Sequence, residues 1–312
     1  MYYLCIRNQT LKTMGELFRA DNIVTYNDWA GVETRNPLAS FIDFTQVKPL
    51  RHCRKLYGVY AIFLKDFKCG DLRYGRRYYD YQEGTLLFVA PGQVFGADDD
   101  GREFQPQGYL LMFHPDLLRH TSLGKGFKEY TFFSYDSNEA LHISTEERKI
   151  VMDCLCNIDY ELTHPVDKHS RELIVDGIKT LLDYCNRFYD RQFITRENQN
   201  SDILAQFESL LEDYFSSGEA ERSGLPTVQY CASKLCLSAN YFNDLLRRET
   251  GNTALKTIHA KIIDLTKTRL VSSADTVSEI AYSLGFRYPQ HLTRLFRNEE
   301  GCTPIEYRRQ CQ

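Results

Sequence analysis

The sequence predicts an α+β chain in which a β-rich region, a helical middle and an all-helical carboxyl-terminal region follow one another. Three observations predict this order. Short apolar runs separated by turn residues fill the first 144 residues, helical spacing begins at a capping box at Ser144, and one helical pattern occurs twice between residues 227 and 303. The predicted segments are a β domain at 1–144, a helical region at 145–217 and a helical domain at 225–312.

Four runs in the first segment have the β-branched and aromatic content of strands. They span residues 57–64, 72–79, 85–90 and 109–113, and the third ends at the turn signal Pro91-Gly92. Short strands with frequent turns are typical of a small barrel or jelly roll, which is the expected architecture of residues 1–144.

The helical middle starts at Ser144, since Ser144 and Glu147 form a capping box. Apolar residues then recur at helical spacing in three stretches, 150–162, 167–188 and 203–214. The second stripe covers two adjoining faces, so we expect one face to pack on the barrel and the other on a second copy of the chain. Its residues are Leu173, Ile174, Ile178, Leu181, Leu182, Cys185 and Phe188. Residues 216–224 lack periodicity and predict a flexible linker.

The repeated pattern runs from Thr227 to Thr253 and again from Thr276 to Thr303. Each copy predicts a helix, a tight turn and a second helix, with Gly285 permitting the second turn. Thr276 with Glu279, and Thr303 with Glu306, are capping boxes. The matched pairs are Val228 and Val277, Ala232 and Ala281, Leu235 and Leu284, Leu237 and Phe286, Phe242 and Leu292, Leu245 and Leu295, Arg247 and Arg297, and Gly251 and Gly301.

The second helix of each copy has a polar and basic face, which is the arrangement that enters a DNA major groove. Residues 225–312 carry a net charge of +4, from 12 basic and 8 acidic residues, while the remainder carries −8. A basic module on an acidic body indicates binding to nucleic acid through one end. We expect base reading by Asn240, Asn243, Gln290 and Arg294, contacts with a thymine methyl or the backbone by Tyr241 and His291, and further contacts, mainly to phosphates, by Ser238, Arg247, Arg248, Arg287 and Arg297.

A helix predicted at about 253–271 separates the two copies, with a buried stripe of Leu255, Ile258, Ile262 and Leu265. At about 1.5 Å per residue it spans roughly 27 Å, which is of the order of one DNA turn. One chain could therefore read two successive major grooves.

The last 90 or so residues resemble the DNA-binding domain of the AraC/XylS transcription regulators. The matching stretches are LSANYFNDLLRRETGNT and VSEIAYSLGFRYPQHLTRLFRNEEGCTPIEYRR. The resemblance implies seven helices, two of them recognition helices. Ile262 and Thr266 depart from it, because Arg and Ala are expected there, and so does Asp244 on the first recognition helix. The run EGTLLFVAPGQ resembles the central hairpin of the cupin-like sensory domain of these regulators, which implies a small-molecule effector.

No catalytic, cofactor or metal site is expected. Metal cupins use paired histidines, whereas here the corresponding strands carry Arg73, Arg76 and Arg77, and His52, His114, His120 and His142 are scattered. The ten cysteines show no close-set ligand pattern, and no signal peptide or long apolar run appears, so a cytoplasmic protein with reduced thiols is expected.

The expected function is a sequence-specific transcription regulator. Its expected partners are double-stranded DNA, a second copy of the chain as a homodimer, an unidentified effector and RNA polymerase, and no membrane. Two alternatives remain at this point. One is a constitutive DNA-binding protein without an effector, and the other is an enzyme, such as a cupin oxygenase or a methyl-accepting repair protein, fused to a DNA-binding domain.

Overall fold

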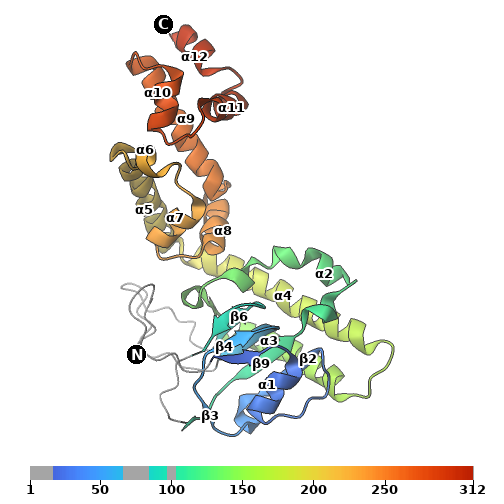
Figure 1. Ribbon diagram of the computed structural model, residues 1–312. Coiled ribbons are helices and arrows are strands. Elements are labelled where there is room, and N and C mark those ends of the chain that lie inside the picture. The colour runs from blue at the N-terminus through green and yellow to red at the C-terminus, as the bar shows by residue number, and fades with distance from the viewer. Residues whose placement is uncertain (1–16, 66–83, 97–102, 312) are drawn as a thin grey trace. The chain divides into compact units, whose positions relative to one another are not determined.

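The computed structural model describes residues 17–65, 84–96 and 103–311. The chain divides into two compact units, Met1–Asp190 and Arg191–Gln312 (Figure 1). The first unit contains the strands and the second is helical, so the predicted α+β class is confirmed.

The described residues of the first unit form three sheets. The largest has the order β10-β6-β5-β9-β2 and is antiparallel, with β2 at Ala39–Asp43, β5 at Tyr60–Lys65, β6 at Thr85–Val89, β9 at Tyr109–Phe113 and β10 at Leu141–His142. The smaller sheets join β1 (Phe18–Ala20), β4 (Lys55–Tyr57) and β7 (Val94–Phe95), and β3 (Leu50–Arg51) and β8 (Glu103–Phe104). The strands predicted at 57–64, 85–90 and 109–113 match β5, β6 and β9, whereas 72–79 lies outside the described residues.

The central strands β5, β6 and β9 each carry four consecutive buried apolar residues, because both faces of the large sheet are covered there. One face of β6 contributes Leu87 and Val89 to a core that includes Ile23 of the helix α1 (Ile23–Ala30). On the other face the Phe88 ring lies 4.3 Å from the ring of Phe132, between centroids. Phe132 belongs to the 3-10 helix η4 (Thr131–Ser134), so this short helix closes the second face of the strand.

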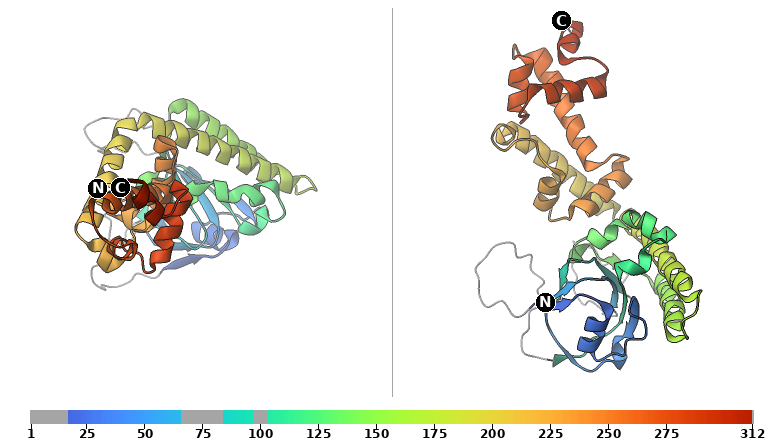
Figure 2. Two further views of the ribbon diagram at one scale, coloured as in Figure 1. Left: turned by 90° about the horizontal axis from the view of Figure 1, so that it is seen from above. Right: turned by 45° about the vertical axis from the view of Figure 1, so that its right-hand side comes forward.

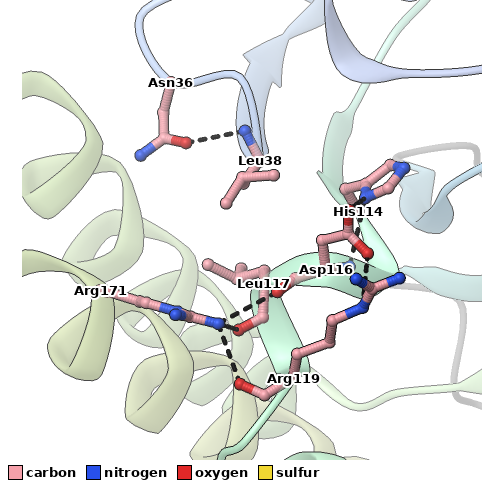
Figure 3. Close-up of polar contacts among 7 residues, drawn as sticks. All are labelled: Asn36, Leu38, His114, Asp116, Leu117, Arg119 and Arg171. Atoms are coloured by element: carbon pink, nitrogen blue, oxygen red, sulfur yellow. Dashed lines mark hydrogen bonds and ion pairs between the residues drawn. The ribbon is translucent and has the colours of Figure 1, made fainter.

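Two long helices, α3 (Thr145–Thr163) and α4 (Ser170–Thr195), lie side by side (Figure 2). The capping box of Ser144 and Glu147 that begins α3 is confirmed. Arg171 fixes the start of α4, because its guanidinium donates hydrogen bonds to the carbonyl oxygens of Asp116, Leu117 and Arg119 at 3.0, 3.1 and 2.9 Å. Figure 3 shows this group beside two shorter-range contacts, Arg119 with Asp116 and the Asn36 side chain with the Leu38 amide.

The stripe predicted to leave a face of α4 for a partner is internal. Leu173 is 49% exposed, but the other six predicted residues, Ile174, Ile178, Leu181, Leu182, Cys185 and Phe188, are buried within this one chain. The prediction that this stripe forms a dimer interface is therefore wrong, because neighbouring elements of the same chain already cover both of its faces. The homodimer itself stays a prediction.

The second unit is formed by the end of α4 and by the helices that follow it. They are α5 (Glu197–Ser216), α6 (Glu219–Ser223), α7 (Val228–Lys234), α8 (Ala239–Thr250), α9 (Ala254–Ser272), α10 (Val277–Ser283), α11 (Pro289–Glu300) and α12 (Pro304–Cys311). Seven helices, α6 to α12, thus lie within the described part of the chain after residue 218, and the first begins before the predicted start at 225.

The flexible linker predicted at 216–224 is wrong as local structure. Residues 219–223 form α6, Ala220 is completely buried, and the Tyr214 hydroxyl donates a 2.8 Å hydrogen bond to the carbonyl oxygen of Gly224. The helix α5 also packs into this unit, since the rings of Phe207 and Phe242 meet edge to face at 4.9 Å. The functional limits 1–144, 145–217 and 225–312 remain predictions. Within the described residues, no helix is both long enough and apolar enough to cross a membrane.

Candidate nucleic-acid interface

The first predicted helix-turn-helix consists of α7, a tight turn and α8. The Thr227 hydroxyl oxygen accepts from the Tyr230 amide to begin α7, and the Ser238 hydroxyl oxygen accepts from the Tyr241 amide to begin α8. Ala232 and Phe242 are completely buried where the two helices meet. Both side chains belong to the core of the second unit, which anchors the two helices of the motif.

The second motif consists of α10, a turn at Gly285 and α11. Its capping box of Thr276 and Glu279 is confirmed, and so is the turn, since Gly285 has a φ of +90°. A methyl group on Gly285 would lie 2.7 Å from the carbonyl oxygen of Ala220 in α6. The turn is therefore pressed against backbone; its φ favours glycine, and the close approach requires it.

The helix α9 joins the two motifs and holds each of them. Its 19 residues span roughly 28 Å at about 1.5 Å per residue. Lys267 forms a 2.8 Å ion pair with Glu300 of α11, and Arg269 donates a hydrogen bond to the Ser283 hydroxyl of α10. From the other side, the Asn243 side-chain oxygen in α8 accepts from the Ala254 amide at 3.1 Å, at the first residue of α9.

The buried face of α9 is rotated relative to the predicted stripe. Ile258 and Ile262 are buried as expected, but Leu255 is 51% exposed and Thr266 is completely buried. Thr266 tolerates burial because its hydroxyl donates a 2.7 Å hydrogen bond to the carbonyl oxygen of Ile262. Ile262, which occupies a position where the family resemblance led us to expect arginine, is turned into the core and is not available to a DNA backbone.

The predicted contact residues of the second motif share one exposed surface. The first of them precedes α11 and the others belong to it; all five, Arg287, Gln290, His291, Arg294 and Arg297, are exposed. Gln290, Arg294 and Arg297 are spaced by four and three residues, which places them on the same side of the helix. Their opposite side contributes Leu292 and Phe296 to the core, so the helix is oriented by burial.

The predicted contact residues of the first motif are only partly available. Asn240, Arg247 and Arg248 are exposed on α8, and Ser238, which is half-buried, caps the helix. Tyr241 is only 4% exposed, and its ring lies 5.0 Å from the ring of Phe193, between centroids. The prediction that Tyr241 contacts DNA is therefore wrong, because the ring faces the protein.

Asn243 is half-buried, and its side-chain oxygen is engaged at the start of α9, as described above. Its predicted role in base reading competes with this bond, which fastens α8 to α9.

Two residues that contact α8 from outside the motif, Phe193 and Asn200, were not predicted from the sequence. The ring of Phe193, near the end of α4, carries the guanidinium of Arg248 at 4.8 Å from its centroid as well as packing on Tyr241. The buried side chain of Asn200 donates hydrogen bonds to the Glu249 carboxylate at 2.6 Å and to the Phe193 carbonyl oxygen at 2.8 Å. A weak signal existed, since Phe193 prolongs the apolar spacing of α4 beyond Phe188.

Cysteine and metal chemistry find little support among the described residues. No group of three or more His, Cys, Asp or Glu side chains there could hold a metal ion. No disulfide joins the described cysteines, and burial raises the pKa of the Cys231 thiol to about 11, which keeps it protonated and unreactive at neutral pH. The exposed arginines on α8 and α11, in contrast, suit a polyanion.

Comparisons with known proteins agree with this geometry. Residues 231–310 match the family model described as a helix-turn-helix domain. A curated protein of Escherichia coli strain K12, an uncharacterized HTH-type transcriptional regulator named YijO, is 24% identical over 227 residues, which are 73% of this chain and 76% of that protein.

Solved structures with similar folds include DNA-binding domains. The DNA-binding domain of AdpA, in complex with a target DNA, is 25% identical and covers 35% of this chain and 88% of that one, with a TM-score of 0.29. Apo ToxT from Vibrio cholerae covers 88% of this chain and 97% of that one at 9% identity, with a TM-score of 0.26. Because these TM-scores are low, the assignment rests on the family match and on the geometry of the two motifs. The carboxyl-terminal region contains an AraC-type helix-turn-helix domain, and the comparisons support a DNA-binding transcription regulator of that type.

Proposed function

We propose that α8 and α11 enter two successive major grooves of one DNA duplex. The observation that carries this proposal is the duplicated motif, in which both second helices bury an apolar face and expose a polar one. The roughly 28 Å length of α9 is of the order of one DNA turn, about 34 Å.

Within this proposal, the two recognition helices contribute different chemistry. The exposed face of α11 offers Gln290 and Arg294, which match adenine and guanine edges, while α8 offers Asn240. Arg247 and Arg297 occupy matched positions in the two copies and are both exposed, which suits phosphate contacts on either side of the paired grooves.

The test is DNA binding by the full-length protein, measured by fluorescence anisotropy on a sequence selected from random DNA. Arg294→Ala should cost about 1–3 kcal/mol on the selected site and little on random DNA. Arg297→Ala should weaken both equally and lower the slope of log affinity against log salt by about one. Arg309→Ala, an exposed change on α12 outside both motifs, is the matched control. Equal losses on both DNAs for Arg294→Ala would contradict base reading by that residue.

We further propose that residues 1–144 form a cupin-like domain whose small-molecule effector controls DNA binding. A cavity of about 280 Å³ in the first unit supports this part of the proposal. An effector should change affinity for the selected DNA site by the ratio of its affinities for the two states of the protein. A constitutive regulator would show no such change with any ligand that binds the cavity.

The proposed regulator acts as a homodimer, through exposed apolar residues near the start of α4 and not through the six buried residues of its stripe. Val166, in the loop before α4, and Leu173, near the start of α4, are exposed apolar residues. Light scattering of the full-length protein tests the assembly, with Leu173→Glu expected to shift a dimer toward monomer and Leu255→Glu as the matched control. A monomer at micromolar concentration in the unsubstituted protein would end this part of the proposal.

A further inference from the structure

The cavity in the first unit has an aromatic wall. Strand β6 provides Phe88, β7 provides Phe95, η4 provides Phe132, and Tyr135 and Tyr189 complete the aromatic lining. The rings support one another, since Tyr189 stacks on Phe132 at 5.5 Å and meets Tyr135 edge to face at 5.3 Å. These contacts fix the rings in place before any ligand binds, which reduces the ordering cost of binding.

Two of the polar groups in the lining are already engaged within the protein. The Gln93 side chain accepts from the Ala90 amide at 2.8 Å and donates to the Phe133 carbonyl oxygen at 3.1 Å. The Tyr189 hydroxyl donates to the Glu139 carbonyl oxygen at 3.2 Å. The accessible part of the wall is about as polar as it is apolar, so a ligand would meet ring edges and aliphatic carbon on one part of the wall and polar groups on the other.

The charge of the lining is one-sided. Asp136 is the charged side chain that the described residues contribute to the cavity wall, and it is exposed. No lysine or arginine belongs to the wall that these residues form. A carboxylate or phosphate ligand would have to approach Asp136 without a cation to compensate it, whereas an ammonium group would be attracted.

The volume bounds the size of the ligand. A cavity of about 150 Å³ is enough for one benzene ring, so 280 Å³ has room for about two fused rings with a short side chain. Ring faces also attract cations, which adds to the preference set by Asp136.

We propose that this cavity binds a neutral or cationic aromatic molecule of one or two rings, and that Asp136 selects against anionic ligands. The inference rests on the proposed effector function of the first unit, whose site it specifies. The cavity would then select its ligand by charge as well as by shape.

The experiment uses three probes that share one ring system and differ in charge: indole, tryptamine and indole-3-acetate. Binding to the full-length protein, without DNA, is measured by isothermal titration calorimetry and ligand-observed NMR. We expect indole and tryptamine to bind, with tryptamine at least about tenfold tighter than indole-3-acetate. Asp136→Lys should invert the order of the two charged probes, while Asp153→Lys, the same change at an exposed position on α3 outside the cavity wall, should leave it unaltered.

A second variant tests the location. Val94→Trp adds bulk at a half-exposed position of the wall and should weaken all three probes by about tenfold or more while the far-ultraviolet circular dichroism is retained. The inference is overturned if no probe binds at millimolar concentration, if Val94→Trp binds them unchanged, or if the order of affinities ignores the charge at residue 136. None of these outcomes contradicts the two-groove proposal, because DNA binding is measured separately and without any probe.

Discussion

Replacing Gly285 by alanine should destabilise the second helix-turn-helix far more than its backbone conformation alone requires. The φ of +90° costs an alanine about 1–2 kcal/mol. The new methyl carbon would also lie 2.7 Å from the Ala220 oxygen and from the Gly224 carbonyl carbon, well inside the optimal contact of about 3.5–4.0 Å. Overpacking of this kind adds about 1–3 kcal/mol, for a total of about 2–5 kcal/mol.

Gly301→Ala is the matched control for this change. Gly301 has a φ of +75° at the end of α11, and a methyl group there would meet nothing within 4 Å. It carries the backbone cost without the contact with α6, so we expect a loss of only about 1 kcal/mol.

Urea unfolding of the full-length protein measures both variants. With a dependence of about 2 kcal/mol per molar urea, Gly285→Ala should lower the midpoint of the second unit by about 1–2.5 M and Gly301→Ala by about 0.5 M. Hydrogen exchange of peptides from residues 218–224 and 277–300 assigns the loss to α6 and the second motif. Equal losses for the two variants would refute the reasoning, because the contact with α6 would then contribute nothing.

Three further predictions follow from local geometry. Cys236→Gly should stabilise the protein by up to about 1 kcal/mol in urea unfolding, because Cys236 has a φ of 57° that glycine adopts without strain; a loss of stability would show that the cysteine side chain has a packing role. Arg171→Met should lower the stability of the first unit by about 1–3 kcal/mol, since three carbonyl oxygens lose a cationic donor, whereas Arg119→Met, a control on the same surface, should cost less. The backbone and hydroxyl hydrogen bonds of Thr276 hold the pKa of Glu279 below its ordinary value, so the stability from this capping box should be complete above the ordinary glutamate pKa and be lost as the pH falls through the lowered one. Glu279→Gln should remove that part of the acid sensitivity, and an unchanged profile would contradict it.

Features encoded by neighbouring residues could be predicted from the sequence. The capping boxes at Ser144 and Thr276 each depend on a hydroxyl and a glutamate three residues later, and both are present in the structure. The duplicated motif was predictable for the same reason, because its turn and its core positions repeat at a fixed spacing. The exposed set on α11 followed directly, since burial of Leu292 and Phe296 fixes which side of the helix faces outward.

Features encoded by distant contacts could not be predicted. Residues 216–224 have the composition of a linker, yet Ala220 is buried by elements far away in the sequence. The predicted stripe of α9 failed at Leu255, because periodicity gives the spacing of a buried face and not its direction. On α8, Tyr241 and Asn243 lie where DNA-contacting residues were expected. The Tyr241 ring instead packs on Phe193, and the Asn243 side-chain oxygen accepts a hydrogen bond at the start of α9. The region 72–79, with its arginines and tyrosines, lies outside the described residues.

The two turns show how a repeat can keep one backbone and still differ in residue type. In the first copy the Leu237 amide donates to the Ala232 carbonyl oxygen at 2.9 Å, and in the second the Phe286 amide donates to the Ala281 carbonyl oxygen at the same distance. The residues before them, Cys236 and Gly285, both have positive φ. Because the first turn accepts a cysteine, the conformation alone does not demand glycine. The demand in the second copy comes from α6, whose backbone lies where a side chain would have to stand. The short helix that the sequence presented as a linker is therefore the element that breaks the symmetry of the repeat, and it does so at the turn that sets the direction of α11.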